Sequence, residues 1–546
     1  MPLETATATT EKAIPKLKLR ARYIEHLLLA LVLLAVFFVR FHLRNIPLER
    51  DEGEYAYAGQ LMLQGVPPYK LAYNMKLPGT YAAYAVILAI FGQTTAGIHM
   101  GLLVVNLATI FLIFLLARKL EGPVAGVAAA ASYGLLSVSP SVLGFAGHAT
   151  HFVVLAAIAG VLLLLRALEG QSKRLFFFSG ILLGLGFVMK QPGLIFVMFG
   201  GLYLLTAEWQ PNVEKRRKAL AVFSAGAVLP FAFVCLSMWM LGVFPVFWFW
   251  TVSYASQYAS NYGVIAGEYF FMQTFPVIAR ASLEIWIVAA LGILIVIWQR
   301  NTRSKALFLI SFLIFSFLAV CPDFAFRPHY FILLLPSISL FVGIAVSAAT
   351  TALARLPKTK IPIYVPAVII IVLLVGSFWR QRAFLLTTDP VAACRSVYYG
   401  NPFPEALPIA DYIRQHTPEN AQIAVLGSEP EIYFYAHRHS ATGYIYTYGL
   451  MEEQKYAPQM QRQMISEIEG SRPQILVFVN LAVSWLPQPH SEQLIYAWSR
   501  NYIQAHYDLA GVVNVPMTDG FAWGNAARNF QPRPYSAVLV FNRKAE

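Results

Sequence analysis

The sequence is short of charged residues. Only 13% of its 546 residues are Asp, Glu, Lys or Arg, whereas 58% are hydrophobic and 14% are aromatic. This composition excludes a soluble domain of this size, which would need a more polar surface. It predicts a polytopic helical membrane protein.

Cysteines and recognisable local signatures are also scarce. The three cysteines show neither metal-site spacing nor a disulfide framework. We find no glycine-rich phosphate loop and no internal repeat. The first apolar run, 26–39, lacks a small-residue cleavage site after it, so we interpret it as a retained span.

Basic residues exceed acidic ones, which gives a formal net charge of +13. The excess lies in short loops, and this indicates orientation in a membrane rather than nucleic-acid binding. Five loops carry it: 118–119, 173–174, 215–218, 300–305 and 355–360. The positive-inside rule places these loops and a polar tail, residues 1–25, in the cytoplasm. We therefore expect a multi-pass protein of the cell (inner) membrane.

Apolar runs predict about 11 to 13 transmembrane helices within residues 26–379. The expected spans are 26–43, 97–117, 123–140, 149–167, 175–190, 193–206, 219–242, 281–298, 306–321, 328–350 and 361–379. The first outer loop then covers 44–96. Within it, 79–92 is apolar but short for a span, so we expect a helix or shallow hairpin at the outer surface.

The pattern changes over residues 380–546. Apolar runs shorten to strand length at Gln422–Leu426, Ile475–Val479 and Ala537–Phe541. Helix-like stretches, 405–415 and 453–468, lie between them. This alternation predicts a soluble α/β domain, which the orientation places outside the cytoplasm.

The first outer loop carries a charged stretch, Arg50-Asp51-Glu52-Gly53-Glu54-Tyr55. Asp51 and Glu54 have the D-x-x-E spacing of a helix N-cap with its capping box, worth about 1 kcal/mol. The same spacing suits a general base with a polar partner at the membrane surface. The two interpretations are compatible, because a capping carboxylate is also a fixed carboxylate.

Three basic residues on the predicted outer face are candidates for binding an anion. Lys76, in Met75-Lys76-Leu77-Pro78, either binds a phosphate or snorkels to lipid headgroups. Lys190, in a Lys-Gln-Pro-Gly turn, is either an interfacial lysine or a second phosphate cation. Arg327 precedes a span that begins Pro328-His329-Tyr330, where it is either an anion ligand or an interfacial anchor.

Two histidines lie at the start of the span 149–167. His148 and His151 are three residues apart, share a helix face, and could bind a metal or a phosphate oxygen. Interfacial histidines are common, so this pair alone leaves a metal open. The predicted orientation nevertheless places these histidines, the acidic residues and the three cations on one face. Cations beside carboxylates suit a lipid-phosphate donor.

Together these motifs resemble the GT-C-fold glycosyltransferases, in particular the bacterial protein-mannosyltransferase and aminoarabinose-transferase group, known as glycosyltransferase family 39-like. The resemblance rests on Asp51-Glu52, Lys76-Leu77-Pro78, Lys190-Gln191-Pro192, Arg327-Pro328-His329-Tyr330-Phe331, Glu431–Tyr435 and Tyr444–Tyr446. The chain departs from the family's usual Lys-Pro-Pro at Leu77, and has His148 and His151 where an acidic residue is common.

The resemblance implies an enzyme that moves a sugar from a polyprenyl-phosphate carrier to a hydroxyl of a lipid, glycan or protein acceptor, with inversion. It implies that Asp51 is the base or orients the acceptor, and that Glu52 is its neighbour in the motif. Lys76 would bind the donor phosphate, with Lys190 and Arg327 as further phosphate ligands. The candidates for an acceptor or metal site are Glu54, His148, His151 and His329. A divalent metal is the one candidate cofactor.

Two other kinds of function remain open from the sequence. A transporter or flippase of a lipid-linked sugar would place buried charges near the bilayer midplane and show paired halves. The charges here lie at one face and no repeat is evident, which favours the enzyme. A binding or assembly protein would not need the charges of the first outer loop.

Overall fold

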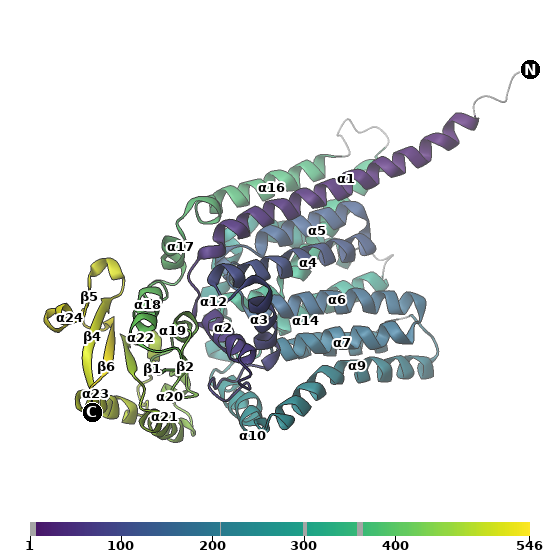
Figure 1. Ribbon diagram of the computed structural model, residues 1–546. Helices are drawn as coiled ribbons and strands as arrows, with labels where there is room; N and C mark the ends of the chain where they lie inside the picture. The colour runs from purple at the N-terminus through teal and green to yellow at the C-terminus, as the bar shows by residue number, and fades with distance from the viewer. Residues whose placement is uncertain (1–6, 208, 299–302, 357–363, 546) are drawn as a thin grey trace, which may run out of the picture.

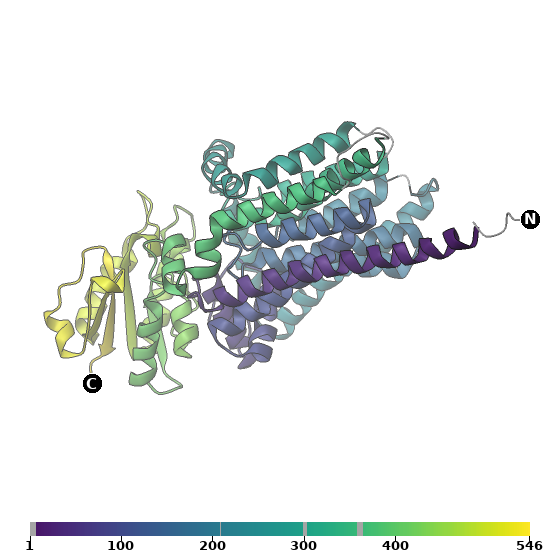
Figure 2. The same cartoon turned by 90° about the horizontal axis from the view of Figure 1, so that it is seen from above.

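The computed structural model describes residues 7–207, 209–298, 303–356 and 364–545. A bundle of long helices forms one part of an elongated molecule, and a mixed α/β region forms the other (Figure 1). The two termini lie at opposite ends (Figure 2). This confirms the predicted fold class, a helical membrane protein with a C-terminal α/β region.

Eleven helices of the described chain match the predicted spans. They are α1 (Thr7–His42), α4 (Thr95–Glu121), α5 (Pro123–Leu136), α6 (Ala149–Gly170), α7 (Lys173–Met189), α8 (Gly193–Thr206), α9 (Val213–Met240), α13 (Leu283–Trp298), α14 (Arg303–Leu318), α15 (Leu335–Ala354) and α16 (Val365–Arg382). The predicted tail, residues 1–25, is helical from Thr7 onward. Residue 300, residues 358–360 and the start of the predicted span 361–379 lie outside the described residues.

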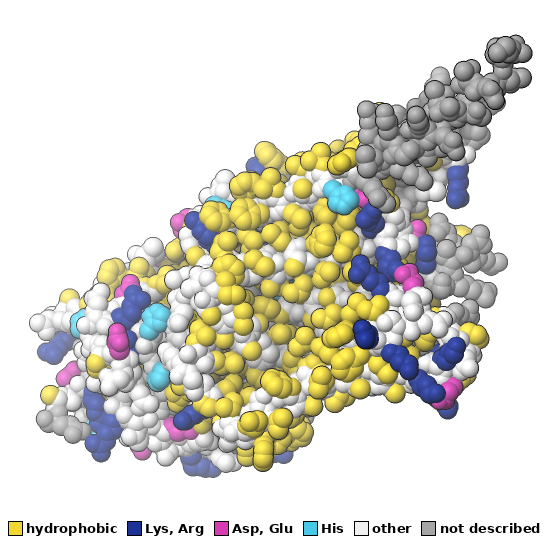
Figure 3. Space-filling view, turned by 45° about the vertical axis from the view of Figure 1, so that its right-hand side comes forward, with side chains coloured by type: hydrophobic (Ala, Val, Ile, Leu, Met, Phe, Trp, Pro, Cys, Tyr) yellow, Lys and Arg dark blue, Asp and Glu magenta, His cyan; other side chains and the backbone are white. Residues whose placement is uncertain are grey.

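Among the described residues, six segments are long and apolar enough to cross a bilayer: Tyr23–Asn45, Thr95–Glu121, Ala149–Gly170, Val213–Met240, Leu335–Ala354 and Val365–Thr387. A seventh results if α12 (Val264–Ala281) and α13, bent by 100° at their junction, form one span. The remaining bundle helices are shorter than the roughly 20 residues that a bilayer requires. Over the bundle, hydrophobic side chains form a broad band with Lys and Arg gathered beyond one edge (Figure 3).

Small residues let the bundle helices approach closely. A Cβ added at Gly180 of α7 would lie 2.1 Å from the carbonyl oxygen of Phe223 in α9, and one at Gly226 of α9 would lie 2.1 Å from that of Phe177. Glycine is therefore required on both sides of this contact. Such contacts are the usual way in which membrane helices gain packing energy.

The first loop forms two short helices, α2 (Arg50–Leu63) and α3 (Pro78–Phe91). The 14 residues of α3 reach only about 21 Å, which confirms the predicted short helix at 79–92. The predicted Asp51–Glu54 capping box is wrong. Glu49 is the N-cap, and it exchanges the capping hydrogen bonds with Glu52. Asp51 lies inside the first helical turn, so its carboxylate is free for other contacts.

The C-terminal region, from α17 (Pro390–Val397) onward, contains a six-stranded sheet of order β2-β1-β3-β6-β4-β5. The strands are β1 (Gln422–Leu426), β2 (His439–Ser440), β3 (Ile475–Leu481), β4 (Tyr507–Asn514), β5 (Phe521–Trp523) and β6 (Ser536–Arg543). The first three pair in parallel and the others antiparallel. Its helices are α18 (Ala406–His416), α19 (Glu431–Ala436), α20 (Tyr448–Met451), α21 (Ala457–Ser471), α22 (Ala482–Trp485), α23 (Leu494–His506) and α24 (Asn525–Asn529).

Three of these strands and two of these helices match the sequence-based expectation, whereas β2, β4 and β5 were missed. Two of the missed strands have only two and three residues. The first loop and the C-terminal region share one hydrophobic core, in which Tyr55 and Tyr84 belong to the same cluster as Val425 and Ile475. The loop is therefore packed between the bundle and the sheet.

Candidate active site

The first loop brings Asp51 and Lys76 into direct contact. The Lys76 ammonium lies 2.6 Å from Asp51 Oδ1 and 2.6 Å from Glu54 Oε2. The Tyr69 hydroxyl donates to the Lys76 carbonyl at 2.7 Å and fixes the backbone there. The side chains of Asp51 and Lys76 are 23% and 17% exposed, so a ligand can reach the pair.

Glu54 holds Lys76 rather than facing a ligand. One of its oxygens accepts from Asn74 at 2.9 Å as well as from Lys76, and the other accepts from the Tyr81 hydroxyl at 2.5 Å. Burial raises the pKa of Glu54, although Lys76 opposes this shift. Both oxygens of Glu54, predicted for an acceptor or metal site, are therefore occupied by Lys76, Asn74 and Tyr81.

Glu52 turns away from the Asp51–Lys76 pair. Its Oε1 accepts from His99 Nε2 at 3.0 Å and from the Gly147 backbone N–H at 2.5 Å. These contacts fix the backbone next to His148. The sequence predicts Glu52 as a catalytic neighbour of Asp51, and in the structure its carboxylate contacts His99 and the Gly147 backbone rather than the Asp51–Lys76 pair.

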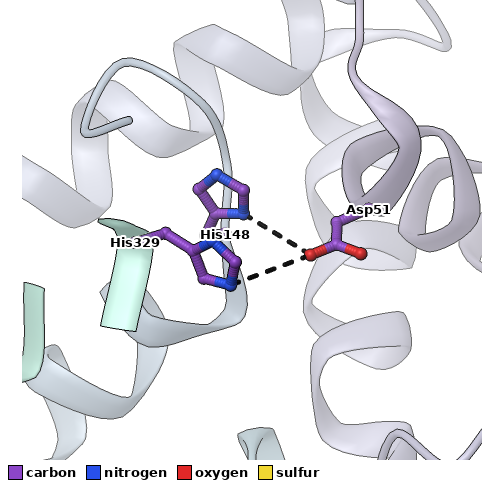
Figure 4. Close-up of side chains that lie close together, drawn as sticks. All are labelled: Asp51, His148 and His329. Carbon is purple, nitrogen blue, oxygen red and sulfur yellow. Dashed lines mark ion pairs between the residues drawn. The ribbon is translucent and has the colours of Figure 1, made fainter. Parts of the chain in front are cut away.

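Two histidines from distant parts of the chain face Asp51. His148 is the N-cap of α6, and His329 lies in a short 3-10 helix, η5 (Pro328–Leu333). Their rings stack with centroids 4.1 Å apart and planes at 11°. His148 Nδ1 lies 3.7 Å and His329 Nε2 4.0 Å from Asp51 Oδ2 (Figure 4). Neither ring nitrogen of the buried His148 has a hydrogen-bond partner among the described residues.

Asp51, His148 and His329 form a candidate metal-binding group, with one ligand atom from each residue lying within 4.8 Å of the others. His151, predicted together with His148 as a metal or phosphate ligand, is not part of this group. His148 precedes the helix and His151 lies within it, buried in the protein. Burial, and then His148 and Lys190, lower the pKa of His329, which favours the neutral ring that metals bind.

Lys190 and Arg327 add positive charge near the same carboxylate. Gln191 donates to the Met75 carbonyl at 2.7 Å, which ties the Lys190 turn to the segment that carries Lys76. The Lys190 ammonium lies 4.2 Å from the Tyr330 ring centre, and no carboxylate of the described residues forms an ion pair with it. Arg327 donates to the Tyr258 hydroxyl at 3.2 Å. Within the part of the chain that the structure describes, neither Lys190 nor Arg327 forms an ion pair with a carboxylate.

The charged groups at the site shift one another's pKa values. Burial alone would raise the pKa of Asp51, but Lys76 and the two nearby histidines outweigh it and hold that pKa well below its usual range. Burial likewise opposes the charge of Lys76, and Asp51 with Glu54 outweighs it, so the pKa of Lys76 is raised. Burial lowers the pKa of Lys190 to about 8. Asp51 and Lys76 are therefore both charged at neutral pH.

The structure thus brings together Asp51, Lys76, His148 and His329, with Lys190 and Arg327 close by. Sequence reasoning missed Tyr446, whose hydroxyl donates to Asp51 Oδ1 at 3.2 Å. It also missed His99, which supports Glu52. The Tyr-Ile-Tyr motif contributed to the family resemblance, but a contact across almost 400 residues gives no local signal.

Comparison with solved structures identifies the architecture. The crystal structure of ArnT from Cupriavidus metallidurans bound to undecaprenyl phosphate matches with a TM-score of 0.54 at 16% identity, and the match covers 94% of this chain and 97% of that one. The protein has the fold of ArnT. The archaeal oligosaccharyltransferase AglB from Archaeoglobus fulgidus, solved with an inhibitory peptide and a dolichol-phosphate, shares this fold at a TM-score of 0.52 and 13% identity, over 96% of this chain and 76% of AglB.

Part of this ArnT fold also shows sequence similarity to known families. A family model described as dolichyl-phosphate-mannose-protein mannosyltransferase matches residues 76–239. An undecaprenyl phosphate-alpha-4-amino-4-deoxy-L-arabinose arabinosyl transferase of Pseudomonas aeruginosa is 32% identical over 208 residues, which make up 35% of this chain and 36% of the relative. A protein of the same name from Pseudomonas paraeruginosa matches equally. The chain thus matches about a third of the length of these relatives.

Proposed function

We propose that this protein is an inverting membrane glycosyltransferase that moves a sugar from a polyprenyl-phosphate carrier to an acceptor hydroxyl. The contact that carries the proposal is the 2.6 Å pair of Asp51 and Lys76. Lys190 and Arg327, which have no carboxylate partner among the described residues, lie near it. A carboxylate beside several cations suits a reaction that removes a proton and releases a phosphate. The names of the relatives above, and the lipid phosphates bound to the solved structures, support this donor class.

In the proposed reaction, the acceptor hydroxyl gives its proton to Asp51 while its oxygen attacks the anomeric carbon. The bond from that carbon to the phosphate oxygen breaks, and the electron pair leaves with the lipid phosphate. Lys76, with Lys190 and Arg327, stabilises the phosphate charge. Attack opposite the leaving group inverts the anomeric configuration.

The resting ion pair makes Asp51 a weak base, because Lys76 holds the pKa of this carboxyl low. A donor phosphate competes for the Lys76 ammonium, since it carries negative charge of its own. Donor binding therefore weakens the ion pair and raises the basicity of Asp51. This couples proton removal to the presence of the donor.

We propose that Asp51, His148 and His329 can hold a divalent metal. The donor set of one carboxylate and two imidazoles suits zinc and related ions, and the buried His148 nitrogens lack other partners. A metal here would supply Lewis-acid stabilisation of negative charge. In that state Asp51 would orient the acceptor instead of taking its proton.

Metal binding can be tested without turnover. Titration calorimetry of metal-free protein with Zn²⁺ or Mn²⁺ should show one site that is lost in His148→Ala and in His329→Ala. His490→Asn, at an exposed histidine of the C-terminal region, should bind as the wild type does. Equal metal binding by all four proteins contradicts this site.

The proposed setting is the outer face of a cell (inner) membrane. A cytoplasmic N-terminus and a C-terminal domain outside the cytoplasm would give the site access to lipid-linked donors there. The division into residues 1–25, 26–379 and 380–546 stays a prediction. The acceptor would be a lipid, a glycan or a protein.

The direct test incubates purified protein with a panel of polyprenyl-phosphate sugars and acceptors, and detects bare lipid phosphate by mass spectrometry. Asp51→Asn should reduce release at least about a hundredfold, because an amide cannot accept the proton. Asp508→Asn, at an exposed aspartate of β4, should retain wild-type release. Near-normal turnover by a folded Asp51→Asn protein would remove Asp51 from the mechanism.

The transporter alternative makes a different prediction. A flippase would move the intact lipid-linked sugar across vesicles without releasing lipid phosphate. No described feature favours it: the charged group lies at one end of the bundle, beside the C-terminal region.

A further inference from the structure

The C-terminal region contacts the first-loop helix α2 and the residues just before it. The Tyr57 hydroxyl accepts from the Ser440 N–H at 2.8 Å, and the Tyr435 hydroxyl accepts from the Leu48 N–H at 2.9 Å. A Cβ at Gly53 would lie 2.6 Å from the backbone nitrogen of Glu431. The first turn of α2 is therefore in backbone contact with α19.

A buried ion pair joins the two parts next to Asp51. Arg50 Nη2 lies 3.0 Å from Glu429 Oε1, and the Arg50 Nε also donates to the Ser428 carbonyl. The other Glu429 oxygen accepts from the Ser484 hydroxyl at 2.6 Å, and Glu429 is fully buried. Because Arg50 is the first residue of α2, this pair fixes where the helix begins.

Tyr446 of the C-terminal region contacts the Asp51 carboxylate directly. Its hydroxyl donates to Asp51 Oδ1 at 3.2 Å, the same oxygen that accepts from Lys76 at 2.6 Å. The other oxygen, Oδ2, is the one that faces His148 and His329. Tyr446 and Lys76 together fix the rotation of the carboxylate, so that Oδ2 points away from both.

We infer that the C-terminal region completes the site: Tyr446 is a positioning residue for Asp51, and the Arg50–Glu429 pair holds the helix turn that carries it. This inference rests on the proposed function for its kinetic test. It goes beyond that function because it assigns the α/β region a part in positioning the Asp51 carboxylate. Without this region, only the contact with Lys76 would restrain the rotation of the Asp51 carboxylate.

Tyr446→Phe removes the hydroxyl and leaves the ring in place. We expect kcat to fall about tenfold to a hundredfold, as is typical of losing a hydrogen bond to a charged group, while the donor KM stays within about twofold. Tyr444→Phe is the matched control, because its hydroxyl donates to Gln463 at 3.0 Å and not to Asp51. Wild-type kcat in Tyr446→Phe, or an equal loss in both variants, overturns the role of Tyr446.

Hydrogen exchange tests the ion pair without turnover. Glu429→Gln should speed exchange of the Gly53 amide, which donates to the Glu49 carbonyl at 2.8 Å in the first turn of α2. Amides at the other end of α2 should be unchanged, as should all α2 amides in Tyr444→Phe. Unchanged exchange at Gly53 overturns the role of the Arg50–Glu429 ion pair in holding the first turn of α2.

These two readouts separate the inference from the proposed function. Wild-type protein that releases no lipid phosphate from any donor contradicts the function. Faster Gly53 exchange in Glu429→Gln would still support the role of the Arg50–Glu429 ion pair. Active wild-type protein with neither effect contradicts the inference and leaves the function standing.

Discussion

Lys76 is shared between two carboxylates, and this sharing explains much of the site. Asp51 and Glu54 each lie 2.6 Å from its ammonium, but only Asp51 is partly exposed. Glu54 is buried with its oxygens occupied by Asn74 and Tyr81, so it anchors the lysine. Removing the lysine would leave a buried carboxylate without its cation, which typically costs about 3–5 kcal/mol. Lys76 therefore has a structural role in addition to its proposed role in binding the donor phosphate.

The proposed contact of Lys190 with the donor phosphate implies a pH dependence of donor use. Burial lowers the pKa of this lysine to about 8, so it is charged below about pH 8 and neutral above. Only the charged form attracts a phosphate, and kcat/KM reports ionisations of the free enzyme. We expect kcat/KM for the donor to fall as the pH rises through about 8.

Lys190→Arg tests this assignment, because an arginine keeps its charge throughout that range. The alkaline fall should then move to higher pH. Lys70→Arg, at an exposed lysine of the first loop, should leave the profile unchanged. An alkaline limb that is the same in all three proteins would assign it to another group.

At the scale of elements, the site depends on the docking of α2. Its N-terminus is capped by Glu49 and Glu52, and its Gly53 lies against α19. The capping box leaves Asp51 free, while the glycine lets the C-terminal region come close enough for Tyr446 to reach that carboxylate. A helix with a bulkier residue at this contact could not seat in the same place.

Gly53→Ala should therefore reduce both stability and turnover. The new methyl would meet the Glu431 backbone at 2.6 Å, and such overpacking costs about 1–3 kcal/mol. Thermal unfolding in detergent should show a lower melting temperature, with kcat reduced at temperatures where the protein is folded. Gly470→Ala in α21 is the control, because nothing lies within 4 Å of a Cβ there. Equal stability of the two variants would mean that α2 can shift without cost.

At the scale of the whole molecule, the bundle and the C-terminal region lie end to end (Figure 1). The helix α2, which carries Asp51, lies at their junction. Hydrophobic side chains cover the bundle between this junction and the basic edge (Figure 3). A membrane enclosing that band would place the site at one bilayer surface. The proposed lipid-linked substrates could then reach it with their polar groups in water.

Topology reporters test this placement. Alkaline phosphatase fused after residue 545 should be active in cells and green fluorescent protein there should be dark, because the C-terminus is expected outside the cytoplasm. A fusion at the 173–174 loop should give the opposite pattern. Reversed activities would invert the orientation and place the site in the cytoplasm.

The sequence by itself determined the membrane class, the positions of the bundle helices and three of the six strands. Apolar length and alternation are local properties, and burial in lipid or a sheet imposes them directly. It also singled out Asp51, Lys76 and the cations, because charges near apolar spans need a partner or a use.

Only the tertiary structure decided how these residues divide their tasks. Asp51 and Glu54 look alike in the sequence, yet the Asp51 side chain is partly exposed whereas the Glu54 side chain is fully buried against Lys76. The pairing of His148 with His329, and of Asp51 with Tyr446, joins residues that are hundreds of positions apart. Such contacts depend on how the helices and the sheet pack together, and packing of distant segments leaves no periodic signal in the chain.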